Sequence, residues 1–376
     1  MSDGTGSYAY TYSDRGEMLS VTYPGGRVVS YAYDVVGQRT AMTLSGYGTT
    51  TFLYYDNGSQ ASFTTPDGKT FAYAYNRNGA VTEQINGNGT KVEYVYNSRG
   101  LLTNLLNKKS DNTVLSSFAY TLDAAGNRVG MTEADGATTT WSYDDLYQLT
   151  REVKRNGAGT VFHDVSYTYD LAQNRTSMTN NLTNTTTNYT YNALNQMLTA
   201  GNVSFTYDAN GNTVSRTVSG QTTSYTWDYE NKLTQITYPN STTNTFTTNA
   251  DGQRVTASDS AGHRWFIYDG ANVVGEQDIT SGNFVVVYDQ ARQMRGVTER
   301  YYHYDGLGST RQLTDASQAV TDATSYDAWG NVLSSSGTTA NPYKYVGSLG
   351  YYADADNGLM LLGARYYGSG LGRLVF

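Results

Sequence analysis

The sequence predicts an all-β fold in which β-hairpins build one continuous, curved antiparallel sheet. A short phrase, Tyr-x-Tyr-Asp-x-x-Gly, recurs about every 21 residues along most of the 376-residue chain. A fixed period of this length is the signature of a repeat architecture. The chain contains 36 tyrosines, and aromatic and β-branched residues favour strands. It contains only four prolines, so few ladders of hydrogen bonds would be interrupted.

Three copies show the phrase most clearly and supply candidate structural residues. They comprise Tyr31, Tyr33, Asp34 and Gly37, then Tyr94, Tyr96 and Gly100, and then Tyr207, Asp208 and Gly211. Two tyrosines two residues apart project to one face of a strand. The Asp or Asn that follows can bond the backbone two residues on and start a turn. The Gly allows the positive φ that closes a hairpin, with a bulge.

A second, more variable turn follows each return strand. Examples are Pro24-Gly25-Gly26, Pro66-Asp67-Gly68 and Asp135-Gly136. Each unit is therefore predicted to hold two strands, one tight turn and one variable turn. The Asn/Thr-rich residues 180–188 form either a loop or an exposed strand pair.

The aspartates that recur at the tight turn are interpreted as turn caps rather than as a carboxylate array. They are Asp34, Asp56, Asp144, Asp170, Asp208, Asp228, Asp269, Asp305 and Asp327. An Asp side chain at the first position of a turn bonds the backbone two residues on. No ligand is needed to explain these carboxylates.

The number of units predicts a hollow body. About 15 units of two strands, spaced ~4.8 Å apart, give a sheet roughly 140 Å wide. A twisted sheet of this width curls or closes. Rolled into one turn it would make a barrel or cup roughly 45 Å across, by the same strand spacing. Its two terminal edges would need a cap or a pairing partner.

Composition and charge argue against several classes of protein. The formal net charge is −8 and no basic cluster stands out, so no nucleic-acid partner is expected. No apolar stretch approaches the ~18 residues of a membrane span. Phe284–Tyr288 and Leu359–Leu362 are strand-length and predict buried sheet instead. The first residues lack the pattern of a signal peptide. Without cysteine, disulfides and thiolate sites are excluded.

A C-terminal set of motifs points to a known family. The stretch Tyr302–Arg311 contains Tyr304, Asp305 and Gly308 in the order of a family phrase, and Tyr326-Asp327-Ala328-Trp329-Gly330 follows it. Further on come Gly358, Leu359, Arg365, Tyr366, Tyr367, Gly372 and Arg373. With these motifs the whole chain resembles the Rhs/YD-repeat family, which includes bacterial polymorphic toxins, the C components of Tc toxins and the teneurins.

The resemblance implies a spiral β-sheet shell around a cavity. Residues 1–300 would form the YD-repeat shell, and residues 301–376 a truncated Rhs-associated core-like segment that plugs one end. In the family a variable toxin polypeptide follows the core inside the shell. The family's Asp-Pro after the Arg-Tyr-Tyr motif is replaced here by Gly368-Ser369. The downstream aspartates of family self-cleavage have no counterpart, so no catalytic residue is assigned.

No cofactor or metal site is expected from the residues. The three histidines, His163, His263 and His303, have no ligand partner at close spacing. Asp354-Ala-Asp356-Asn357-Gly358 lacks the ligand spacing and the bidentate Glu of a calcium loop, so we interpret it as a turn. A noncatalytic protein follows from these residues.

The sequence therefore favours a noncatalytic shell that encloses or carries a polypeptide cargo, such as a toxin outside this chain. The alternative is a surface protein that assembles with its own copies through its edges or binds carbohydrate through exposed Tyr, Trp and Asn. A self-processing aspartyl protease shell is the third hypothesis. A secreted or cell-surface bacterial protein is expected.

The turn assignment gives a first prediction. Replacing Gly37 or Gly211 by Val should lower the free energy of unfolding by about 1–3 kcal/mol, because a β-branched residue is strained at positive φ. Thermal or chemical denaturation measures this loss. Unchanged stability in both variants would contradict a positive φ at these glycines.

Overall fold

The computed structural model, which describes residues 2–375, consists almost entirely of antiparallel sheet, as predicted. The chain begins with a small hairpin, β1 (Ser2–Asp3) and β2 (Gly6–Ser7). One sheet of 32 strands follows, with neighbours in chain order. A separate four-stranded sheet ends the chain.

The first 23 strands of the large sheet are β3 (Ala9–Tyr12), β4 (Met18–Tyr23), β5 (Arg27–Tyr33), β6 (Arg39–Leu44), β7 (Gly48–Tyr54), β8 (Gln60–Thr64), β9 (Thr70–Tyr75), β10 (Val81–Ile85), β11 (Lys91–Tyr96), β12 (Leu102–Lys108), β13 (Val114–Leu122), β14 (Arg128–Glu133), β15 (Thr138–Tyr143), β16 (Leu149–Arg155), β17 (Val161–Tyr169), β18 (Arg175–Asn180), β19 (Thr185–Tyr191), β20 (Met197–Ala200), β21 (Val203–Tyr207), β22 (Thr213–Val218), β23 (Gln221–Trp227), β24 (Leu233–Thr237) and β25 (Thr243–Thr248).

The remaining strands of that sheet are β26 (Arg254–Asp259), β27 (Gly262–Asp269), β28 (Asn272–Asp278), β29 (Phe284–Asp289), β30 (Arg292–Arg295), β31 (Thr298–Tyr304), β32 (Thr310–Thr314), β33 (Val320–Tyr326) and β34 (Val332–Ser336). The last sheet holds β35 (Tyr352–Ala353), β36 (Leu359–Leu362), β37 (Arg365–Gly368) and β38 (Arg373–Leu374), preceded by a short 3-10 turn, η1 (Gly347–Leu349). The Asn/Thr-rich segment resolves into the end of β18, a tight turn and the start of β19.

Each tight hairpin is built from a polar cap, a glycine and a bulge. Asp34 accepts hydrogen bonds through Oδ1 from the backbone N–H groups of Val36 and Gln38, both at 2.9 Å. Gly37 has φ of 85°, where a Cβ would be strained. The register of β5 against β6 shifts just before Tyr33, which is the predicted bulge. Bulges bend a strand and increase its twist, so a bulge in every unit curves the sheet in one sense.

In most units the second tyrosine of the repeat joins its hairpin to the one before it. The Tyr33 hydroxyl donates to the backbone carbonyl of Met18, the first residue of β4, at 2.9 Å. Later units repeat this bond over the same 15-residue separation, with Tyr54 to Arg39, Tyr75 to Gln60, Tyr96 to Val81 and Tyr143 to Arg128, at 2.8–3.0 Å. The bond therefore clamps neighbouring tight hairpins together along one rim of the sheet.

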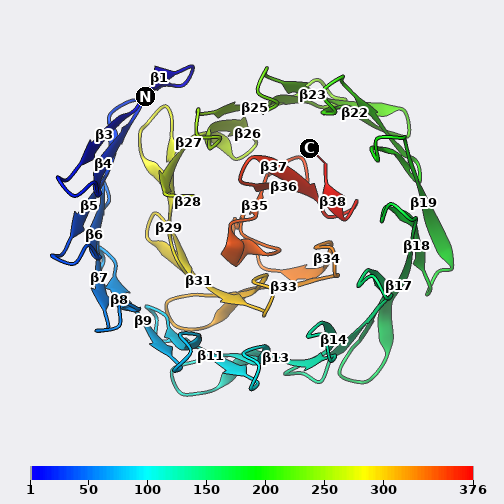
Figure 1. The fold of residues 1–376 in the computed structure, drawn as a ribbon, viewed down its shortest axis with the longest axis horizontal. Coiled ribbons are helices and arrows are strands. Elements are labelled where there is room, and N and C mark those ends of the chain that lie inside the picture. The colour runs from blue at the N-terminus through cyan, green and yellow to red at the C-terminus, as the bar shows by residue number, and fades with distance from the viewer. Residues whose placement is uncertain (1, 376) are drawn as a thin grey trace.

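The sheet winds as a spiral with two free ends. β3 pairs only with β4, and β34 only with β33, among the described strands. In Figure 1 the outer turn runs from β3 to β25, and β27 to β34 lie inside it. Contacts between the turns join residues whose separation falls from 250 for Arg27 and Gln277 to 176 for Glu152 and Ala328. The inner turn covers the same arc with fewer strands.

The inner turn is buried on both faces. Along β27, Ile267 belongs to a cluster with Val29 of the outer turn. The next residue back, Phe266, faces the other way and packs edge-on against Tyr352, with ring centres 5.5 Å apart. Successive residues of a strand point to opposite faces, so one strand serves two cores. Because neither face of such a strand meets solvent, its sequence lacks the alternation of polar and apolar residues that would identify a half-buried strand.

The observed winding confirms the spiral shell that the family resemblance implies, and it differs only from the single turn assumed in the estimate from strand spacing. The sheet makes more than one turn, and its inner turn and the last sheet occupy much of the interior (Figure 1). The division at residue 300 stays a sequence-based prediction, because the large sheet continues through β34 and the separate sheet begins with β35.

The tyrosine clamp can be tested by removing one hydroxyl. Tyr96→Phe leaves the carbonyl of Val81 without its donor and should lower the free energy of unfolding by about 1 kcal/mol. Tyr12→Phe is the matched control. Tyr12 holds the same position in the first unit, is 56% exposed, and its hydroxyl makes no hydrogen bond within residues 2–375. Equal losses in urea denaturation of the two variants would contradict the clamp.

Candidate functional site in the interior of the spiral

The C-terminal segment lies at the centre of the spiral, where β35 to β38 face the inner walls (Figure 1). Hydroxyl groups attach it to both turns. Tyr345 donates to the carbonyl of Ala328 and Tyr367 to that of Trp329, both at 2.8 Å. Thr213, on the outer turn, donates to the carbonyl of Val375 at 2.9 Å. The chain therefore reaches its last described residue inside the spiral.

A buried ion pair fixes this segment to β26. Arg254 Nη1 donates to Asp354 Oδ1 at 2.6 Å, and the two side chains are 3% and 1% exposed. The guanidinium lies 5.0–5.2 Å from the ring centres of Phe246, Phe266 and Tyr352. A charge in such a position is tolerated because its partner and the ring faces replace water.

A second buried carboxylate, Glu276 on β28, gathers hydroxyl and guanidinium donors. It is fully buried and accepts from Tyr288 at 2.7 Å, Tyr352 at 3.0 Å and Arg264 at 2.8 Å. Burial, with the nearby Glu276 charge, raises the pKa of Tyr288 well above its usual value. The hydroxyl therefore stays protonated and remains a donor at neutral pH.

A third cluster locks the inner turn to the outer turn. Arg292, fully buried on β30, contacts Asp67 at 2.7 Å, Asp289 at 2.7 Å and Glu299 at 3.1 Å. Burial acts to raise the pKa of Asp67, but hydrogen bonds from Arg292 and Thr65 lower it to about 2. The carboxylate of Asp67, which lies on a turn of the outer wall, thus stays charged and paired.

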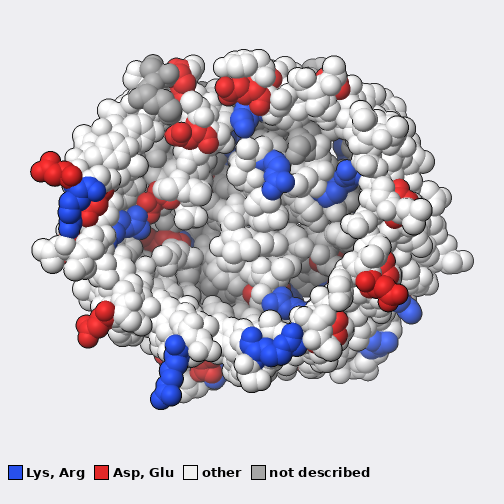
Figure 2. Space-filling model, in the orientation of Figure 1, with Lys and Arg blue, Asp and Glu red and all other residues white. Residues whose placement is uncertain are grey.

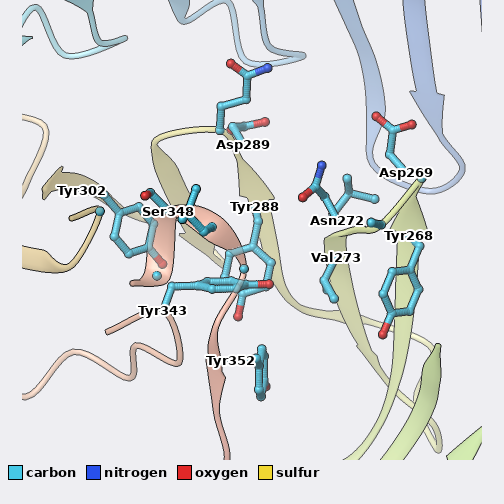
Figure 3. A pocket seen from close by; sticks show the side chains of 18 of the residues that line it. Tyr268, Asp269, Asn272, Val273, Tyr288, Asp289, Tyr302, Tyr343, Ser348 and Tyr352 are labelled. Atoms are coloured by element: carbon cyan, nitrogen blue, oxygen red, sulfur yellow. The ribbon is translucent and has the colours of Figure 1, made fainter. Parts of the chain in front are cut away.

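These walls line a partly open cavity of about 1130 Å³. Figure 3 shows its tyrosine lining, with Tyr288, Tyr343 and Tyr352 arranged edge to face. The ring centres of Tyr288 and Tyr343 are 5.0 Å apart, and those of Tyr343 and Tyr352 are 5.6 Å apart. Edge-to-face pairs of this kind add to the energy of burial. The three packed tyrosine rings therefore form an aromatic wall of this cavity.

The face in Figure 2 is hollowed at its centre, with acidic and basic side chains interspersed around the rim and no large patch of either sign. His303 is fully buried against Thr314, with Nε2 2.9 Å from the hydroxyl oxygen, and burial lowers its pKa to about 4. No group of three or more His, Asp and Glu side chains placed to hold a metal ion occurs within residues 2–375.

The sequence-predicted repeat residues are spread around the outer turn. Tyr31 packs on the core cluster of β4 and β5, and Tyr94 lines the large cavity, where burial raises its pKa to about 12. Tyr207 donates to Met197 at 2.7 Å in the clamp position. The turn residues share the geometry of Asp34 and Gly37: Asp208 caps Asn210 and Asn212, and Gly100 and Gly211 have φ of 75° and 90°.

The predicted core-like residues gather at the interior instead. Tyr304 stacks on Tyr302 at 5.8 Å, and Asp305 caps its turn and lies 3.7 Å from Arg311. Gly308 and Gly372 have positive φ, 90° and 64°. A Cβ at Gly308 would collide with Ser348 of η1, and one at Gly372 would lie 2.9 Å from the Trp329 ring. These glycines allow close approach between the C-terminal segment and the walls.

The remaining core-like residues follow the last sheet. Gly358 has φ of 69° and precedes buried Leu359 of β36, whose N–H donates to Asn357 Oδ1 at 2.7 Å. Tyr366 is buried in the cluster around Phe266, whereas Arg365 is exposed. Arg373 lies over the ring of Tyr191 at 5.4 Å and donates to the carbonyl of Asn195 at 3.2 Å. The last sheet is thus tied to the outer turn as well.

Two aspartates do not cap turns as predicted. Tyr55, rather than Asp56, holds the turn-start position, because the N–H of Gly58 donates to its carbonyl. Asp269 ends β27 and forms a 2.7 Å ion pair with Arg39 of the outer turn. The buried ion pairs were not predicted either, although charged residues within the strands of the inner turn were a signal of them.

No helix among the described residues is long and apolar enough to cross a membrane.

Comparisons with known proteins agree with this architecture. The Teneurin YD-shell family model matches residues 1–153 and 125–375. The tRNA3(Ser)-specific nuclease WapA of Bacillus spizizenii is 33% identical over 196 residues, and the tRNA nuclease WapA of Bacillus subtilis is 31% identical over 195. Each match covers 48% of this chain and only 8% of the relative.

Solved structures share the fold. The Tc holotoxin pore of Photorhabdus luminescens superposes with a TM-score of 0.70 at 20% identity, over 98% of this chain and 20% of that chain. The TcdB2-TccC3 structure gives a TM-score of 0.55 at 16% identity, over 100% and 26% of the two chains. The chain therefore corresponds to a minor part of the length of these proteins.

The ion pair at the centre yields a prediction. Asp354→Asn leaves the buried Arg254 charge unpaired and should cost about 3–5 kcal/mol of stability. It should also release the C-terminal segment to proteases. Asp269→Asn breaks a more exposed pair, whose side chains are 29% and 21% exposed; it is the control and should cost about 1 kcal/mol. Similar losses and similar cleavage in both variants would contradict the anchoring role of Asp354.

Proposed function

The chain belongs to the Teneurin YD-shell family, and we propose that it forms a noncatalytic, closing section of a shell that encloses or carries polypeptide. The observation that carries this proposal is the course of the C-terminal segment. It lies inside the spiral and is bonded to the outer turn at Val375. A polypeptide that continued from this position would begin within the enclosure.

The size of the tyrosine-lined cavity limits what that cavity alone could hold. A folded domain of 100 residues has a radius of gyration of about 13 Å, which corresponds to a volume on the order of 20,000 Å³. The cavity of about 1130 Å³ is far smaller. The proposal is therefore that this section closes one end, and that a folded cargo needs further turns of shell from a longer assembly.

A scaffold role agrees with the state of the interior side chains. The buried carboxylates of Asp354 and Glu276 contact arginines and tyrosine hydroxyls, which occupies them in holding the walls together. The WapA relatives are named as tRNA nucleases, but the match covers 8% of their length. We place any toxin activity outside this section, in a bacterial protein that acts in secreted or cell-surface form.

The free edge of β3 supports a second candidate, assembly between copies. Among the described strands β3 pairs on one side only, and its side chains are mostly exposed. An open edge is a template for an added strand. Concentration-dependent growth in size-exclusion chromatography would favour this candidate, and a monomer at all concentrations would exclude it.

Enclosure is tested by the accessibility of a short epitope peptide appended after Phe376. We expect this peptide to resist protease and antibody in the folded protein and to become accessible on denaturation. The same peptide placed before Met1, at the end of the chain that leads into the outer turn, should be accessible throughout. Equal accessibility at the two ends would contradict the proposal.

A second experiment uses the variant in which the C-terminal segment should be released. The Asp354→Asn variant should expose the C-terminal epitope, whereas Asp269→Asn should leave it protected. A C-terminal epitope that is protected equally in both variants would show that the ion pair does not close the interior.

A further inference from the structure

A second, smaller cavity lies where the outer turn meets the inner turn and the C-terminal segment. Its volume is about 500 Å³, within the range of small-molecule sites. Aromatic side chains dominate its lining, with Trp141 and Tyr143 from β15, Trp329 from the turn before β34, and Tyr345 from the C-terminal segment. Aromatic side chains on several sides suit a ring-shaped ligand.

One cation of this lining lacks a carboxylate partner. Lys154 lies 3.3 Å from Glu152, and Arg311 lies 2.8 Å from Glu133. Arg128, by contrast, donates to the carbonyl of Gly306 at 2.8 Å and lies over the Tyr120 ring at 4.3 Å. It forms no ion pair within residues 2–375. A partly buried guanidinium without an anion can receive one in bidentate geometry.

Two strained residues stand on the same lining. Tyr147 has φ of 62° and Gln173 has φ of 67°. They occupy the turn-closing position that Gly37 and Gly100 fill elsewhere. Both line the cavity, and no side-chain hydrogen bond of either is found in the described chain. Residues held at positive φ cost energy and cluster at ligand clamps.

Gln318 is another turn-closing residue with positive φ, and its side chain makes contacts between the outer and inner turns. It closes its turn at φ of 67°. Its side chain bridges the turns, accepting from the N–H of Ser110 at 2.9 Å and donating to the carbonyl of Asn88 at 2.7 Å. Tyr147 and Gln173 have no such protein partner, which leaves their side chains available at the cavity.

We propose that this cavity binds a small ring-bearing carboxylate. The ring stacks between the aromatic walls near Trp141 and Trp329, and the carboxylate pairs with Arg128. Tyr147 and Gln173 lie at the exposed side of the cavity and contact the ligand there. The shared chemistry is a flat ring with one anionic group, and its source is either a sugar acid or an aromatic acid.

Binding is measured by tryptophan fluorescence, because two of the four tryptophans, Trp141 and Trp329, line the cavity. The probes are glucuronate for sugar acids and indole-3-carboxylate for aromatic acids, the latter followed by calorimetry because it absorbs. Glucose and indole are the uncharged counterparts. Saturable binding of one acid, stronger than that of its counterpart, is expected and identifies the source. No saturable binding of either acid, or equal binding of its counterpart, would overturn the proposal.

The charge is tested by Arg128→Gln, which should weaken binding of the acid roughly tenfold or more and bring it to the level of the uncharged counterpart. Arg99→Gln is the matched control, because Arg99 also holds a turn carbonyl, that of Ala124 at 2.9 Å, and lies outside the lining. Binding should be unchanged in the control. Unchanged affinity in Arg128→Gln would overturn the role of Arg128.

The strain is tested by Tyr147→Gly, which removes the ring and relaxes the backbone. The thermal midpoint should rise or hold while affinity for the acid falls. Asn231→Gly changes the same turn position, φ 59°, outside the lining, and should leave affinity unchanged. A merely structural role for Tyr147 would lower stability without this opposed change in affinity, and that result would contradict the assignment.

Discussion

The hydrogen bond from the second tyrosine of most repeats to the preceding hairpin is the interaction on which this architecture depends. A hairpin alone is marginal in water. The backbone ladder between hairpins specifies which strands pair, and the tyrosine bond adds a contact that positions neighbouring tight turns along the rim. The hydroxyl of Tyr96 reaches the carbonyl of Val81, the first residue of a return strand, and so fixes how adjacent tight turns sit side by side. Repeated around the rim, this contact keeps the bulges in line.

Aligned bulges turn that local contact into a spiral. Because each bulge adds twist in the same sense, the curvature accumulates until the sheet meets its own inner face. Beyond that point strands of the inner turn, such as β27, pack against a core on both of their faces. Charged residues enter these strands, and pairs such as Arg254 with Asp354 and Arg292 with Asp67 attach the inner turn to the centre and to the outer wall. The interior is therefore stabilised by buried ion pairs as well as by aromatic packing.

The sequence predicted local geometry well because the causes are local. Asp34 and Gly37 determine the geometry of a turn only a few residues long, and the repeat made the sheet and its curvature evident. The partners of Asp354 and Glu276 were not predictable, because Arg254 lies 100 residues away and the inner turn has no solvent-facing alternation. The strain at Tyr147 was likewise hidden, since a turn-closing position is recognised by Gly.

The central claim is that residues more than 200 positions apart lie side by side because the sheet overlaps itself. The absence of cysteine permits specific spin labels at Ser110→Cys and Ser317→Cys, where Gln318 accepts from the N–H of Ser110. Electron–electron distance measurement should give one short distance set by the two label tethers. A sheet that did not overlap would place these loops roughly 90–100 Å apart along about 20 strands, and such a distance would contradict the spiral.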